Sequence, residues 1–262
     1  MIHNPATDPR PGRVSPAFVK LASICAMLTA LTTLAVHWLP ELWKDATTFE
    51  AQLQLRHNPI YFGRLWIVLL HCVLVVISMA AIPPLLSGTS KLVAMFGFGS
   101  YVMFAFVEML RTSLSIFAVN RAWRPGYELA ADDVKRTTFR SAIDALSGIN
   151  DALFFLFFLA FVAGLFCYGF ALLSTKGIDQ RIAWLFVLWG LLSLPGLIGA
   201  IAGNESLGAR FGWVGPYFQP IARLLIGLWL WSVSKRLHPA INSQPSTSEL
   251  CLKKKLHPKS AK

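Results

Sequence analysis

The sequence predicts an all-α, polytopic transmembrane bundle of six helices with short loops, and two observations predict it. Hydrophobic residues make up 55% of the 262 residues and charged residues only 14%, against roughly 25% charged in soluble domains. The apolar residues also form six runs of about the 20 residues that a spanning helix needs, namely 17–38, 65–86, 92–117, 150–174, 182–203 and 213–234. Lipid is therefore expected to be the solvent for much of the chain.

The first run, 17–38, also has features of a signal peptide. Arg10, Arg13 and Lys20 precede it, as a charged segment precedes the apolar core of such a leader. The run is long, however, and ends in HWLPELW without a small-residue cleavage site. We expect an uncleaved span. None of the six runs has the two-residue period of a barrel strand, and helices satisfy their own backbone groups in lipid.

The first and third loops are each predicted to contain one interfacial helix. In loop 39–64 the stretch TTFEAQLQLRH is good helix material and ends before Pro59. In loop 118–149 Asp132 or Asp133 can cap a helix that runs straight into the fourth span. The domains expected are a cytoplasmic N-terminal segment (1–16), the transmembrane domain (17–234) and a basic, disordered tail (235–262).

The distribution of basic residues sets the expected orientation. With the N-terminus inside, the inner segments hold thirteen of the lysines and arginines and the outer segments nine, so the positive-inside rule favours cytoplasmic termini in a bacterial inner membrane. The net charge is +11. Its basic residues lie between apolar runs and in the tail rather than on an aromatic-interleaved face. We therefore expect membrane lipids as partners and no nucleic acid.

Charged residues inside the apolar runs define a candidate site. Glu108 and Arg111 are three residues apart in the third span, so they share a helix face and can pair. Arg140, Asp144 and Asp151 form a polar stripe that leads into the fourth span. We expect Arg111 to meet Asp151. The residues gathered in the outer half are Arg64, His71, Glu108, Arg111, Asp144 and Asp151.

Arg223 lies near the middle of the sixth span and has no acid three or four residues away. We expect Glu108 or an acid of another span to pair with it, or water to surround it. Two interpretations of all these charges stay open. The charges either pin the helices together or form a pocket, open to the outside, for a small ligand, a proton or a lipid headgroup.

No catalytic, metal or cofactor motif is present. The sequence contains no CxxC pair, Gly-rich phosphate loop, GxSxG or HExxH, so we expect no catalytic residue, cofactor, metal or disulfide framework. The leading hypothesis is a non-enzymatic membrane protein with a sensing, regulatory or structural role. The alternative is a small-solute or proton-coupled transporter that uses Glu108, Arg111 and Arg223, and a membrane-embedded enzyme comes third.

Gly199 and Gly203 form a GxxxG pair in the stretch GLIGAIAG. Such glycines let two helix backbones approach closely. The pair predicts either packing within the chain or a homodimer.

The layout resembles the bacterial six-helix membrane proteins grouped as domain of unknown function 4386. The resemblance covers roughly residues 17–234. It rests on the short first span, on TTFEAQLQLRHNPIYFGRLWIVLLHCVL leading into the second, on the tight turn that follows, and on INDALFFLFFLAFVAGLFCYGFALL followed by GIDQRIAWLFVLWG. It implies an integral membrane protein without an assigned activity and carries over no site residue.

Overall fold

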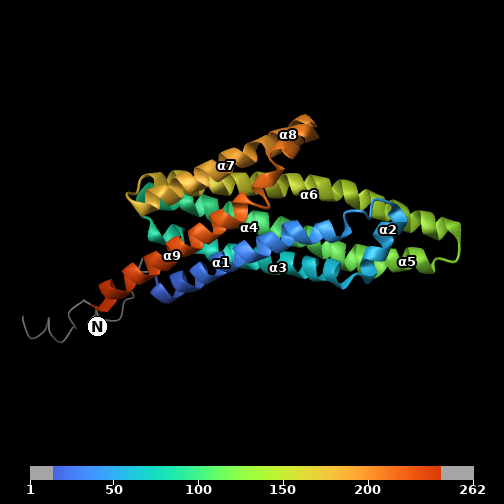
Figure 1. Ribbon diagram of the computed structural model, residues 1–262, viewed down its shortest axis with the longest axis horizontal. Coiled ribbons are helices and arrows are strands. Elements are labelled where there is room, and N and C mark those ends of the chain that lie inside the picture. The colour runs from blue at the N-terminus through green and yellow to red at the C-terminus, as the bar shows by residue number, and fades with distance from the viewer. Residues whose placement is uncertain (1–13, 243–262) are drawn as a thin grey trace, which may run out of the picture.

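The computed structural model describes residues 14–242, which fold entirely into helices and short connections (Figure 1). The long helices are α1 (Pro16–Trp38), α3 (Pro59–Ala80), α4 (Gly88–Ser113), α6 (Asp133–Leu173), α7 (Ile178–Ala202) and α9 (Phe218–Asn242). The shorter elements are η1 (Leu39–Trp43), α2 (Phe49–Gln54), η2 (Leu55–His57), η3 (Pro83–Leu85), η4 (Leu114–Trp123), α5 (Arg124–Leu129), α8 (Glu205–Arg210) and η5 (Gly212–Val214).

Five of the helical segments between residues 14 and 242 are long and apolar enough to cross a membrane. They are Pro16–Trp43, Pro59–Leu85, Gly88–Leu129, Asp133–Leu173 and Ile178–Ala202. Many large apolar side chains on their outer surfaces are exposed, among them Leu31, Phe96 and Phe106, which is compatible with a lipid-facing bundle. The run predicted as a sixth span forms α9, which continues to Asn242. The remainder of the predicted tail and residues 1–13 lie outside the described residues.

The long helices form a ring. Helix α1 packs against α9 and α3, α3 against α4, α4 against α6, and α6 against α7. The contact between α7 and α9 is the thinnest of the ring. At one end of that seam Asp179 accepts hydrogen bonds from Trp229 Nε1 at 2.7 Å and from Arg236 Nη2 at 3.2 Å. Away from that end α7 diverges from the bundle in Figure 1.

Glycines allow α4 and α6 to lie close together. A Cβ atom on Gly164 would come within 2.9 Å of the Tyr101 ring, and one on Gly97 within 3.0 Å of the Cys167 Cβ. Gly199 is itself buried within the chain, and Gly203 has a φ of 64° and ends α7. Both glycines of the GxxxG pair therefore have roles inside one chain, and the homodimer stays a prediction.

The third loop, predicted over 118–149, is largely helical. Asp132 caps α6 by accepting a hydrogen bond from the Lys135 backbone N–H at 2.8 Å, and α6 then runs 41 residues without a break. At 1.5 Å per residue this is about 60 Å, twice the hydrocarbon thickness of a bilayer. The predicted helix of this loop is thus the first part of α6. In Figure 1, α5 and this part of α6 extend beyond the end of α1 as a hairpin.

The first loop folds onto the hairpin. Thr48 caps α2 by accepting from the Ala51 N–H, and the Phe49 ring packs edge-on against Tyr127 of α5 with centroids 5.1 Å apart. Arg56 forms an ion pair with Glu128. Helix α2 therefore holds the base of the hairpin against the bundle.

Candidate functional site

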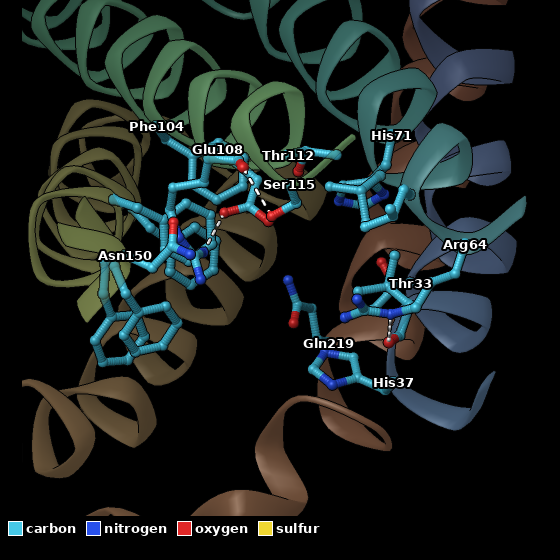
Figure 2. Close-up of a pocket in the computed structure, with 18 residues that line it drawn as sticks. Thr33, His37, Arg64, His71, Phe104, Glu108, Thr112, Ser115, Asn150 and Gln219 are labelled. Carbon is cyan, nitrogen blue, oxygen red and sulfur yellow. Dashed lines mark hydrogen bonds and ion pairs between the residues drawn. The ribbon is translucent and has the colours of Figure 1, made fainter. Parts of the chain in front are cut away.

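A cavity of about 320 Å³ lies inside the ring, in the half of the bundle nearest α2 and the hairpin. Five long helices and the π-helix η4 supply its wall, as Figure 2 shows. Among the residues predicted for the site, Arg64, His71, Glu108 and Arg111 lie on this wall. The folded chain therefore brings together residues that are up to 47 positions apart, from Arg64 to Arg111.

The polar side of the cavity carries three charged residues. Arg111 donates from Nη1 to Glu108 Oε2 at 2.5 Å. Arg64 donates from Nε to the Val36 carbonyl oxygen at 3.2 Å, which satisfies one of its five N–H groups but not its charge. With two arginines and one glutamate, the wall has one unbalanced positive charge, and this favours an anion.

Two histidines add hydrogen-bonding groups at the same wall. His71 Nδ1 and Thr32 Oγ1 share a hydrogen bond of 2.7 Å, so the ring of His71 is fixed in the space between α1 and α3. His37 and Gln219 lie close to each other at the edge of the cavity in Figure 2. The side that faces the charged residues is therefore rich in groups able to orient a polar ligand.

Aromatic side chains form the apolar side of the cavity, namely those of Phe104, Phe154, Phe157, Phe158 and Phe161. The Phe104 and Phe157 rings stack with centroids 4.5 Å apart, and the Arg111 guanidinium lies 5.3 Å from the Phe154 centroid. A second cavity of about 360 Å³, lined in part by η5 and α7, shares Phe158 and Phe161 with the first. Together they suit a ligand with one charged end and an apolar body.

Buried polar atoms without a hydrogen-bond partner gather in and below this cavity. Among the residues that the structure describes, all six such side-chain atoms belong to Tyr101, Arg111, Asn150 and Arg223. Four of the six are arginine nitrogens, which can only donate. Native proteins leave few buried groups unsatisfied. The surplus of donors is thus a second, independent indication of an anion.

Arg223 is fully buried, with 0% of its surface exposed. Its guanidinium carbon lies 5.4 Å from the Trp189 ring centroid. No acid between residues 14 and 242 pairs with it, and the expectation that Glu108 does so is wrong, because Glu108 is bound to Arg111. Burying a charge without a partner removes its hydration and is costly, so a buried and unpaired Arg223 is destabilising unless another group neutralises it.

The expected contact between Arg111 and Asp151 is also not formed. Asp144 and Asp151 are exposed and do not line the cavity. On α6 the cavity is lined instead by Asn150, Phe154, Phe157 and Phe161, and Asp151 is rotated about 100° from Asn150 around the helix axis. The polar stripe exists, but packing turns it away from α4.

Several lining residues were not predicted from the sequence, among them Thr33, His37 and Asn150. The spacing of Phe154, Phe157, Phe158 and Phe161 is a one-face helical pattern, and it was the available signal for which face of α6 points inward. Asn150 lies one turn before it on that face.

No family model, curated protein or solved structure matches the chain. No cluster of three or more metal-ligating side chains occurs in the range 14–242.

Proposed function

We propose that the protein binds a small organic anion in the central cavity and has a sensing or regulatory role rather than a catalytic one. The observation that carries this proposal is the wall itself, on which Arg64 and Arg111 face a single acid, Glu108. A carboxylate matches the planar fork of an arginine. The phenylalanine wall would contact the apolar body, as is usual in ligand pockets.

We further propose that the chain is a six-span, multi-pass protein of a bacterial inner membrane with both termini cytoplasmic. The five long apolar helices and the position of α9 against α1 support six spans, and the excess of basic residues at the inner ends supports the orientation. In this orientation the cavity and the hairpin are on the outer side, so the ligand would come from outside the cell. The resemblance to the domain of unknown function 4386 group is part of this proposal.

Benzoate and its uncharged analogue benzamide test the proposal, because the two differ mainly in charge. Purified protein in detergent is titrated with each compound and its thermal unfolding midpoint is followed. A ligand that binds only the folded state at 100 times its Kd stabilises it by about 2.7 kcal/mol. We expect benzoate to raise the midpoint saturably and benzamide to leave it unchanged.

Variants assign that effect to the cavity. Arg64→Gln and Arg111→Gln should each weaken benzoate binding at least tenfold. Arg121→Gln is the matched control, because Arg121 is exposed and lies over the Phe117 ring, away from the cavity. The proposal fails if benzoate and benzamide act alike, or if the control weakens binding as much as the two cavity variants do.

Transport of the anion is the second candidate function, and the position of Arg223 favours it. This buried cation lies towards the middle of the bundle, one helical turn along α9 from the cavity residue Gln219. A second binding position on a transport path would lie in such a place. Proteoliposomes that take up labelled benzoate, with uptake lost in Arg223→Gln, would establish transport. Saturable binding without uptake would leave the sensing role.

A homodimer through Gly199 and Gly203 is a further proposal about the assembly. Light scattering of the protein–detergent complex should then report two chains. A single chain in the wild type would refute it.

A further inference from the structure

Arg223 and Tyr101 lie at the centre of the ring, below the cavity. Both residues have 0% of their surface exposed. All three guanidinium nitrogens of Arg223 and the hydroxyl of Tyr101 lack a hydrogen-bond partner. Two neighbouring donor groups, fully buried and both without an acceptor, are the arrangement expected around an anion.

No hydrogen-bond acceptor among the described residues reaches the Arg223 guanidinium. The ionisable side chains whose charges interact with that of Arg223 are those of Tyr101, Cys72, His71 and His37, and none of them is a carboxylate. The Trp189 ring lies beside the guanidinium, which stabilises a cation but neutralises nothing. The nearest acid of the cavity, Glu108, is held by Arg111. The charge of Arg223 is therefore uncompensated by the described residues.

Phe161 separates this position from the cavity. Its ring lies on the cavity wall, and its centroid is 6.2 Å from that of Tyr101 and 5.3 Å from that of Trp189. Only 5% of Phe161 is exposed. Phe104, also on the cavity wall, has its centroid 6.1 Å from that of Tyr101, so Phe161 and Phe104 both lie between the cavity and the Tyr101 ring.

We propose that Arg223 and Tyr101 form a second anion site, deeper than the cavity and closed by Phe161, for a monoanionic group of a few atoms. The group is either the carboxylate of the cavity ligand, in which case the inference rests on the proposed function, or a free inorganic anion such as chloride. Because both side chains are 0% exposed, an anion can reach them only when Phe161 or another neighbour moves, and a bulky anion is excluded. The guanidinium supplies charge and the phenol a second hydrogen bond.

The fluorine resonance of Trp189 is the readout for this site. Because Trp189 also lines the second cavity, only a shift that is lost in Tyr101→Phe and Arg223→Met counts as binding at the deep site. The protein is labelled with 5-fluorotryptophan, and the fluorine signal of Trp189 is identified by its loss in Trp189→Phe. Chloride and benzoate are added separately to protein in HEPES buffer free of other small anions. We expect at least one of them to shift the Trp189 signal saturably, while the signals of tryptophans far from the site, such as Trp43, stay in place.

Two variants connect the shift to the proposed residues. Tyr101→Phe keeps the ring and removes only the hydroxyl, so it should fold and should weaken the anion effect on Trp189 at least tenfold. Arg223→Met should abolish the effect. Arg64→Gln, a cavity variant, should leave a chloride effect on Trp189 intact, which separates the deep site from the cavity.

The outcomes separate the two sources and the two proposals. A chloride shift that is lost in Tyr101→Phe and Arg223→Met identifies a free anion, and a benzoate shift lost in the same two variants identifies the carboxylate of the ligand. If neither compound moves the Trp189 signal while benzoate still raises the unfolding midpoint, the second site is wrong and the proposed function stands. If chloride moves it while benzoate leaves the midpoint unchanged, the second site stands and the proposed function fails. A shift that persists unchanged in Tyr101→Phe and Arg223→Met also overturns the second site.

Discussion

Glu108→Gln should destabilise the protein and tighten anion binding at the same time. Glu108 accepts a 2.5 Å hydrogen bond from Arg111, and the two side chains are only 18% and 24% exposed. A hydrogen bond to a charged group contributes about 1.5–3 kcal/mol. A neutral amide can keep part of that bond but loses the attraction between charges, so we expect the free energy of unfolding to fall by about 1–2 kcal/mol.

The gain in affinity follows from charge. A bound carboxylate about 6 Å from the Glu108 carboxylate would be repelled by about 3 kcal/mol at an effective dielectric constant near 20. Glu108→Gln removes this repulsion and leaves Arg111 unpaired. Half of that energy already corresponds to about a tenfold change in Kd. Benzoate titrations of wild type and variant, followed by the unfolding midpoint, measure it.

Glu128→Gln is the matched control. Glu128 pairs with Arg56 outside the cavity, and the two side chains are 26% and 21% exposed, close to the values for Glu108 and Arg111. This variant should lose similar stability without a change in benzoate affinity. If folded Glu108→Gln protein binds benzoate no more tightly than wild type, the charge assigned to the cavity is wrong.

Three further predictions concern the frame around the site. Asn120→Leu should lower the free energy of unfolding by about 2 kcal/mol, measured from the unfolding midpoint, because the Asn120 amide donates to the Ser115 carbonyl and accepts from buried Arg124, both at 2.6 Å; an unchanged midpoint would contradict this. Gly164→Ala should lower the free energy of unfolding by about 1–3 kcal/mol, since the Tyr101 ring must move to make room for the added Cβ. Gly148→Ala should cause no such loss, because a Cβ at Gly148 meets no atom within 4 Å. Single cysteines are introduced at exposed sites in loops 45–47 and 130–132, or at residue 176, in a background without native cysteines. The loop cysteines should react with an impermeant thiol reagent in intact cells, and the cysteine at residue 176 only after permeabilisation. The reverse pattern would refute the orientation.

The sequence was sufficient to predict the long helices, but not which face of each helix points into the bundle. Apolar runs of about 20 residues predicted each long helix, and Asp132 was one of the two residues expected to cap the helix that became α6. These are local properties, set by hydrophobicity and by capping chemistry. The number of spans stays a prediction, because α9 is not among the segments long and apolar enough by composition.

The partners of the buried charges could not be predicted from one helix at a time. Spacing alone allowed Arg111 to pair with Glu108 or with Asp151, and the choice depends on how α6 is rotated against α4. That rotation is set by the close approach at Gly97 and Gly164. The sequence indicated that Arg223 has no acid nearby on its own helix. Its position against the Trp189 ring, however, depends on α7 and α9 meeting at the same depth. Contacts between side chains of different helices do not produce a periodic pattern in the sequence, so they could not be predicted from it.

The length of α6 has a mechanical consequence. The helix runs unbroken from Asp133 in the hairpin to Leu173, and Asn150 on the cavity wall lies near its middle. A continuous helix transmits tilt and rotation along its axis, since no turn lies between the two halves to absorb them. A force that tilts the hairpin would therefore also move Asn150 and the phenylalanine wall that follows.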